Sequence, residues 1–188
     1  MNKNLSSYIQ IYSDWITPDI CNMATAELKT AEWELNTFYI PSTGETHSPS
    51  GENELDMAYN QNGKELNALI MKRVWEGIFK YASEGHGFSN WTGHSPVRYN
   101  RYVENKLMAK HWDNITTLFD GTIRGAPTLS IIGLLNDDFD GGEFVMWHDD
   151  IIQLKAGDLM LFPSTFLYPH QVKPVKKGIR YSCVSWAW

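Results

Sequence analysis

The amino-acid sequence predicts an α+β domain in which two helices precede a β-sandwich or barrel, and a jelly roll is the favoured form. Two segments in the first half of the chain repeat apolar residues at helical spacing. From about residue 96 the chain changes to short apolar or alternating runs separated by turns, as in all-β domains. Among such folds a jelly roll is favoured because the mouth of its barrel can hold a small ligand and a metal.

Length and composition favour a single globular domain. The chain has 188 residues, of which 43% are hydrophobic and 20% charged. We expect residues 1–95 to form helical support and residues 96–188 to form the jelly-roll core. No run reaches the apolar length of a membrane span, and the first residues lack the apolar stretch of a signal peptide. These features predict a cytoplasmic protein without a membrane partner.

The net charge bears on the possible partners, and the two cysteines bear on disulfide bonding. The net charge of −6 argues against nucleic acid, since phosphate contacts need a basic face. Cys21 and Cys183 are expected to be free buried thiols, with a single disulfide as the alternative. Nucleic acid is therefore not an expected partner, and the sequence predicts no oligomeric state.

The first half of the chain is expected to hold an extended arm, two helices and a long polar segment. Residues 1–16 predict the arm, and a helix follows with Thr17 as N-cap and Pro18 at its first position, as far as about Trp33. Residues 41–56 are polar and rich in turn formers, so they predict a loop that is either disordered or a lid over a substrate. The second helix spans about residues 63–82, with an apolar stripe of Leu66, Leu69, Ile70, Val74, Ile78 and Tyr81.

The second half predicts eight short strands. They are expected near residues 97–103, 107–112, 128–135, 142–147, 151–154, 158–162, 168–172 and 180–188. Turns are expected at 104–105 and 148–150, where polar residues separate the runs. The β-branched run at 128–135 is almost entirely apolar and is typical of a central strand.

Two histidines and one aspartate form a candidate metal site. His111 and Asp113 are two residues apart, so on a strand their side chains project to the same face. His148 and Asp150 have the same spacing, but they fall in the expected hairpin turn and are interpreted as solvated. His170 follows an apolar strand and is expected to face inward, with a hydrogen-bonded core histidine as the alternative. Two His and one carboxylate with open positions suit non-haem Fe(II).

A buried cation is expected next to this group. Arg180 opens the apolar terminal strand, where an unpaired charge is costly, so an anion must accompany it. That anion is either a protein carboxylate or a bound ligand's, which an arginine can hold with two parallel bonds. Tyr102, nine residues before His111, is either a hydrogen-bond donor to the same ligand or a half-buried strand residue.

Four motifs then occur in order over the second half of the chain. They are Tyr102-x-x-Asn105-x-x-Met108-x-x-His111-x-Asp113, Leu135-Asn136 followed by Gly141-Gly142-Glu143, Gly157 to Pro163, and His170 to Tyr181 followed by Trp186. Residues 97–188 with these motifs resemble the Fe(II)/2-oxoglutarate-dependent dioxygenases, and most closely their prolyl 4-hydroxylase-like branch. Asn105 replaces a usual Gly, Met108 an aromatic residue, and Pro127 stands where relatives carry an Arg.

The resemblance implies a double-stranded β-helix and a role for each site residue. His111, Asp113 and His170 would be the iron ligands and the catalytic centre. Arg180 would bind the C5 carboxylate of 2-oxoglutarate with the help of Tyr102 and Ser130, and Trp186 would line the metal pocket. The implied cofactors are Fe(II), the cosubstrate 2-oxoglutarate and O2, with ascorbate as a further candidate.

The activity implied by the resemblance is hydroxylation of an unactivated C–H bond with release of succinate and CO2. A prolyl residue in a peptide or protein is the leading substrate. A free amino acid or another small molecule is the alternative within this class. An alternative of another class is a non-catalytic metal-binding jelly-roll module.

Overall fold

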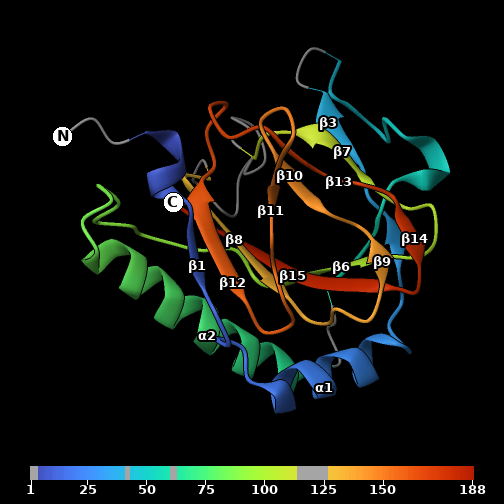
Figure 1. The fold of residues 1–188 in the computed structure, drawn as a ribbon, viewed down its shortest axis with the longest axis horizontal. Helices are drawn as coiled ribbons and strands as arrows, with labels where there is room; N and C mark the ends of the chain where they lie inside the picture. Colours follow the sequence, from blue (N-terminus) through green and yellow to red (C-terminus); the bar gives the residue numbers. More distant parts are fainter. Residues whose placement is uncertain (1–3, 41–42, 60–62, 114–126) are drawn as a thin grey trace.

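The protein is built from two facing β-sheets with both helices on the outer side of the larger sheet (Figure 1). The computed structural model describes residues 4–40, 43–59, 63–113 and 127–188. All pairings between the named strands are antiparallel. The predicted sandwich with helices packed outside one sheet is therefore confirmed.

The larger sheet has seven strands, three of which come from the N-terminal part of the chain. In spatial order they are β1 (Gln10–Tyr12), β12 (Leu159–Pro163), β8 (Leu129–Leu134), β15 (Arg180–Ala187), β6 (Arg98–Tyr102), β5 (Asp56–Ala58) and β2 (Glu34–Leu35).

The smaller sheet has four strands and covers the other face of the sandwich. In order they are β11 (Asp150–Ile152), β10 (Phe144–Met146), β13 (His170–Val172) and β7 (Met108–His111). Two short pairs complete the set: β14 (Val175–Lys177) with β9 (Asp140–Gly141), and β3 (Phe38–Ile40) with β4 (Glu45–His47).

Side-chain alternation along the strands creates two separate cores. On β15, Tyr181 and Cys183 face the helices, whereas Val184 faces the smaller sheet. The outer core joins these residues to the apolar stripes of both helices. The inner core lies between the sheets and includes Phe144, Phe162 and their neighbours. The inward-facing polar residues of β6 and β15 interrupt this inner core, and they define the candidate site.

The helices follow the predicted periodicity, with one difference in length. Helix α2 (Lys64–Ser83) has the predicted bounds, and five of its six stripe residues are buried while Leu69 is half-buried. Helix α1 (Pro18–Leu28) starts where predicted but ends about five residues earlier. The indole of Trp33 turns back and donates its Nε1–H to the carbonyl of Leu28 at 3.3 Å, so a side chain takes the place of the next helical turn.

The segment 41–56 is more structured than its composition predicts. Apart from residues 41 and 42, which lie outside the described residues, it contains β4, a short 3₁₀ helix (Gly51–Asn53) and the start of β5. The carboxylate of Asp56 is buried but pairs with Arg101 at 2.8 Å and with Lys106 at 2.6 Å. Polar residues here pair inside the protein, which composition alone does not indicate. The lid role stays a prediction.

The remaining expectations are met with small shifts. All eight predicted strands occur, while β2 to β5, β9 and β14 were not predicted as strands. The arm forms a 3₁₀ turn (Leu5–Tyr8) and β1, its first three residues being outside the described part. Cys21 and Cys183 are buried free thiols, as predicted. Over the described ranges, neither helix has the length and apolar character needed to cross a bilayer.

Candidate functional site

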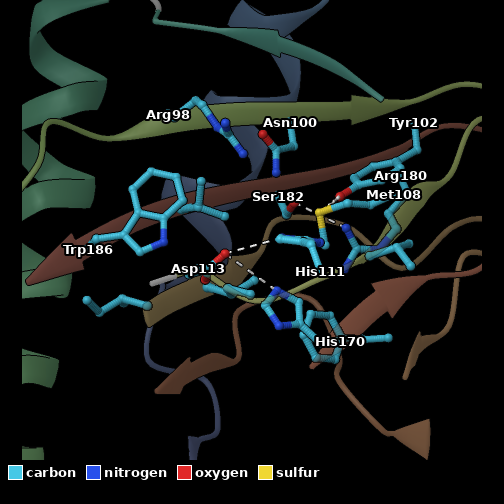
Figure 2. Close-up of a pocket in the computed structure, with 15 residues that line it drawn as sticks. Arg98, Asn100, Tyr102, Met108, His111, Asp113, His170, Arg180, Ser182 and Trp186 are labelled. Carbon is cyan, nitrogen blue, oxygen red and sulfur yellow. Dashed lines mark hydrogen bonds and ion pairs between the residues drawn. The ribbon is translucent and has the colours of Figure 1, made fainter. Parts of the chain in front are cut away.

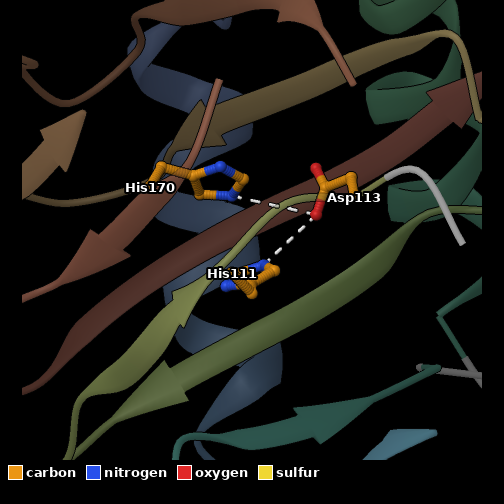
Figure 3. Close-up of side chains that lie close together, drawn as sticks. All are labelled: His111, Asp113 and His170. Carbon is orange, nitrogen blue, oxygen red and sulfur yellow. Dashed lines mark ion pairs between the residues drawn. The ribbon is translucent and has the colours of Figure 1, made fainter. Parts of the chain in front are cut away.

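The three predicted metal ligands meet at the inner face of the smaller sheet. His111 ends β7 and lies directly opposite His170, the first residue of β13, in the antiparallel register. The Oδ1 atom of Asp113 is 3.2 Å from Nε2 of His111 and 3.8 Å from Nε2 of His170 (Figure 3). One ligand atom from each residue lies within 4.8 Å of the others, so the group can hold a metal ion.

Backbone carbonyls orient both imidazoles. Nδ1 of His111 is 2.8 Å from the carbonyl oxygen of Ala109, and Nδ1 of His170 is 3.0 Å from that of Tyr168. Because a carbonyl can only accept, each Nδ1 must carry the proton and donate it. The unprotonated Nε2 atoms are thereby turned toward Asp113, as in metal sites whose ligands are held by a second layer of hydrogen bonds.

The aspartate is oriented by two serines. The hydroxyl of Ser130, on the central strand β8, donates to Oδ2 of Asp113 at 2.6 Å. Ser164 lies 2.8 Å from the same hydroxyl. With Oδ2 occupied, Oδ1 remains free to face the two imidazoles.

The protonation states of the group suit a metal. Burial lowers the pKa of His170 to about 4. Burial alone would raise the pKa of Asp113, but the two histidines and the hydroxyl of Ser130 outweigh it and hold this pKa below its usual value. At neutral pH the site therefore presents a neutral imidazole and an ionised carboxylate, the forms that bind metals.

Arg180 lies in the same pocket as a buried cation. Its side chain is only 2% exposed. Nη1 donates to Ser182 at 3.1 Å, and the guanidinium lies 4.9 Å from the ring centroid of Tyr102. Among the described residues no carboxylate is within ion-pair distance of it. A bound ligand's carboxylate, one of the two anions considered from sequence, stays a prediction.

The pocket itself runs between the two sheets, with the metal group in its middle. Figure 2 shows Arg180 and Tyr102 at one end and Arg98 and Trp186 at the other, with Asp113 between them. Tyr102 and Trp186 line this pocket, and the roles that the resemblance implies for them stay predictions.

One residue, Ser130, lies at a different place in the site from the one that the resemblance implied. Ser130 contacts Asp113 and not the surroundings of Arg180, because β8 pairs with β15 in a register that sets Ser130 opposite Trp186. Ser182 contacts Arg180 instead. The signal for Ser182 was its position two residues after Arg180, on the same face of one strand.

Other pocket residues follow the same alternation. Arg98 and Asn100 precede Tyr102 by four and two residues on β6, and sequence reasoning did not single them out. His148 is exposed in the turn between β10 and β11, which confirms that the second His-x-Asp pair is not part of this site.

The donor set fits the cofactors implied by the resemblance. Two imidazole nitrogens and one carboxylate oxygen point to one centre, and they suit iron with further coordination positions open. An unpaired guanidinium buried in the same pocket suits a cosubstrate that carries a carboxylate.

Comparisons with known proteins agree with this geometry. The model of the family described as the 2OG-Fe(II) oxygenase superfamily matches residues 97–188. A PKHD-type hydroxylase of Acinetobacter baumannii is 31% identical over 130 residues, which cover 64% of this chain and 53% of the relative. One of Nitrobacter winogradskyi is 27% identical over 185 residues, which cover 95% and 77%. The chain spans about half the length of several curated relatives that it matches.

Solved structures give the fold. A prolyl hydroxylase from Trichoplax adhaerens, in complex with a peptide fragment of the hypoxia inducible factor oxygen degradation domain, superposes with a TM-score of 0.73 at 15% identity, covering 96% of this chain and 83% of that one. A Pseudomonas putida prolyl-4-hydroxylase superposes with a TM-score of 0.65 at 17% identity, covering 96% and 91%. These likenesses confirm the double-stranded β-helix.

Proposed function

We propose that the chain is an Fe(II)- and 2-oxoglutarate-dependent dioxygenase of the prolyl 4-hydroxylase-like branch that hydroxylates an unactivated C–H bond. The match of residues 97–188 to the 2OG-Fe(II) oxygenase superfamily model and the similarity to PKHD-type hydroxylases support this proposal. The family implies Fe(II), 2-oxoglutarate and O2 as cofactors. The observation that carries the proposal is the joint placement of a His-Asp-His group and the unpaired guanidinium of Arg180 in one pocket.

In this proposal His111, Asp113 and His170 would hold the iron, since each offers one ligand atom to a common centre. Fe(II) bound there would supply oxidation by O2, in which one oxygen atom goes into the succinate formed with CO2 from 2-oxoglutarate and the other enters the substrate. The chain's own contribution is to position the reactants and to exclude water.

Each remaining residue has a positioning role. Arg180 holds the distal carboxylate of 2-oxoglutarate, with Ser182 and Tyr102 fixing the guanidinium. Ser130 keeps the carboxylate of Asp113 turned toward the metal. Trp186 forms a wall of the pocket.

The leading substrate is a prolyl residue in a peptide or protein. The support for it is the set of prolyl hydroxylases among the structural neighbours, one of which is bound to a peptide. A free amino acid or another small molecule is a second candidate, and a specific observation favours it: Arg98 is another guanidinium in this pocket that forms no ion pair with a carboxylate of the described residues. Ascorbate would act as a reductant that keeps the iron in its Fe(II) state.

A non-catalytic metal-binding module is the rival from another class. A structural metal site is usually closed by four protein ligands, whereas a catalytic site keeps positions open. In the described part of the chain this group has three candidate ligands. Three protein ligands, which leave coordination positions open, favour an enzyme over a structural metal site.

The test is anaerobic addition of Fe(II) and 2-oxoglutarate to the purified protein. We expect a weak visible charge-transfer band that is lost in His111→Ala, in Asp113→Ala and in Arg180→Ala. Arg101→Ala is the matched control, because Arg101 lies on β6 but pairs with Asp56 on the outer face. Absence of the band in the native protein would favour the non-catalytic module, and full substrate-dependent succinate formation in Asp113→Ala would refute the ligand assignment.

Substrate identity needs a second measurement. Proline-rich peptides and free amino acids are incubated with the loaded enzyme in air, with and without ascorbate. Mass spectrometry then detects the addition of one oxygen atom.

A further inference from the structure

A second arginine, Arg98, faces the pocket from the same strand as Tyr102. The side chains of Arg98, Asn100 and Tyr102 line the pocket from alternate positions of β6. In the register with β15, Tyr102 lies opposite Arg180 and Arg98 lies opposite Val184. Four residues of strand separate the two ends by about 13 Å. The pocket therefore has a guanidinium at each end, with the metal group between them (Figure 2).

The hydrogen bonds that the structure shows for Arg98 are made by Nη1 and leave Nε without a partner. Nη1 donates to Oδ1 of Asn36 at 3.3 Å, and Sδ of Met57 lies 4.0 Å away. The guanidinium carbon lies 5.1 Å from the ring centroid of Trp186. Nε is buried and has no hydrogen-bond partner. The edge formed by Nε and Nη2 is the one that binds a carboxylate through two parallel bonds.

Arg98 is attracted by the buried carboxylate of Asp113, which lines the same pocket, but it forms no direct ion pair in the described part of the chain. No carboxylate there lies within ion-pair distance of it. The neighbouring Oδ1 of Asn100, which lines the same pocket, is likewise buried without a hydrogen-bond partner. Buried polar atoms are rarely left unpaired in folded proteins, so two of them on the same strand wall of one pocket indicate a ligand that pairs with them.

The charge of the loaded pocket points to the sign of that ligand. Two guanidiniums and a divalent metal carry four positive charges, while Asp113 is the single acidic residue among the described lining residues. The two carboxylates of 2-oxoglutarate add two negative charges. One positive charge then remains, and it belongs to Arg98, which lies away from the end that holds Arg180.

We propose that Arg98 binds a carboxylate of the primary substrate, so that the substrate class is a carboxylate-bearing molecule oxidised at a C–H bond between Arg98 and the metal. Its Nε and Nη2 donate to the two carboxylate oxygens, and the indole of Trp186 packs on the guanidinium. An amide N–H or hydroxyl of the substrate donates to Oδ1 of Asn100. The inference rests on the proposed function and adds to it the end of the pocket that selects the substrate.

The carboxylate can come from two sources, and the experiment separates them. Free L-proline and the other free amino acids form one arm, and each is paired with its uncharged amide. Prolyl peptides form the second arm, with either an acidic or a neutral residue beside the proline. We measure oxygen addition by mass spectrometry, consumption of 2-oxoglutarate, and the Fe(II)–2-oxoglutarate charge-transfer band in the same samples.

We expect oxidation of carboxylate-bearing members of one arm, with the matched amide or neutral peptide at least about 30-fold poorer in kcat/KM. Arg98→Gln should raise KM for the acid by a similar factor and leave the charge-transfer band unchanged. Arg98→Lys keeps the charge without the planar fork, so it should give an intermediate KM. Arg101→Gln, on the outer face of the same strand, should leave this KM unchanged.

The outcomes distinguish the two levels of the proposal. If the native protein shows no charge-transfer band with Fe(II) and 2-oxoglutarate, the proposed function itself is refuted. A band in both native protein and Arg98→Gln, with equal KM for acid and amide, refutes the role of Arg98 alone. The role of Arg98 is also refuted if no carboxylate-bearing compound in either arm is oxidised and none increases the consumption of 2-oxoglutarate.

Discussion

Replacement of Arg180 by methionine should stabilise the metal-free protein and weaken 2-oxoglutarate binding at the same time. The methionine keeps most of the apolar stem but removes a cation that is 2% exposed and lacks a carboxylate partner. Burial of an unpaired ion costs several kcal/mol, on the order of 5. Its contact with the ring of Tyr102 returns about 2 kcal/mol, and its bond to Ser182 about 2 more. The balance predicts that the free energy of unfolding of the metal-free variant rises by about 1 kcal/mol, which corresponds to about 2–4 °C in Tm.

The effect on the cosubstrate has the opposite sign. Loss of one partner of a buried, hydrogen-bonded charge pair costs about 2–5 kcal/mol, which is about 30- to 4,000-fold in Kd. At a 2-oxoglutarate concentration of about 100 times Kd, the native protein loaded with Mn(II) gains about 2.7 kcal/mol of stability. If Kd rises about 100-fold, the same concentration stabilises the variant by only about 0.4 kcal/mol.

The assay is thermal and urea unfolding of both proteins with Mn(II), with and without 2-oxoglutarate. Arg101→Met is the matched control, because this arginine pairs with Asp56 on the outer face of the sheet. The control should lose stability and keep its response to 2-oxoglutarate. A loss of more than about 2 kcal/mol in metal-free Arg180→Met would show that the guanidinium already has a strong partner, and the reasoning would then be refuted.

Three further changes test other parts of the structure. The pKa of His170 is lowered to about 4 in the folded protein, so the unfolded chain takes up a proton first and the free energy of unfolding should fall from about pH 6.5 toward pH 4, by about 1.4 kcal/mol per pH unit. Urea unfolding of metal-free protein should show this slope, and an equal slope in His170→Asn would contradict it. Ser130→Ala removes the donor that orients Asp113, and it should weaken metal affinity about 10- to 100-fold in a chelator competition; an unchanged affinity would rule out that role. Gly141 has a φ of +76° and a backbone carbonyl 2.5 Å from an added Cβ, whereas Gly44 has a φ of +72° and open space. Both alanine variants should lose about 1–2 kcal/mol from the backbone conformation, and Gly141→Ala should lose clearly more in urea unfolding; equal losses would show that the close contact relaxes without cost.

Much of the fold is encoded in local periodicity. The apolar stripe of residues 63–82 predicted α2 almost to the residue, because helical spacing is a property of neighbouring positions. The alternation of the C-terminal runs predicted the strands for the same reason. Where buried polar residues pair with each other, the pattern was misleading: Asp56 lies in β5, on the outer face of the sheet, because Arg101 and Lys106, more than forty residues away, pair with it.

The site residues likewise fall into those that local sequence indicated and those that only the pairing of distant strands brought together. The spacing of His111 and Asp113 suggested a shared face on one strand, and the family resemblance implied their role as ligands. In the structure β7 ends at His111, and Asp113 lies two residues beyond it. Ser130 and Ser182 were harder, because each lies beside its partner only through the register of β8 with β15 and the direction of β15. Arg98 shares a face with Tyr102 by simple alternation, but sequence did not show that the guanidinium lacks a carboxylate partner.

The sequence by itself therefore determined helix α2, the start of helix α1 and eight of the strands, and it indicated the His-x-Asp pair and the need of Arg180 for an anion. Only the tertiary structure decided that His170 lies opposite His111, that no carboxylate among the described residues reaches Arg180, and that Arg98 faces the same pocket. The physical reason is that side-chain direction along a strand is set by its own backbone. The pairing of distant strands is set instead by the burial of both apolar faces of the larger sheet, one against the helices and one against the smaller sheet.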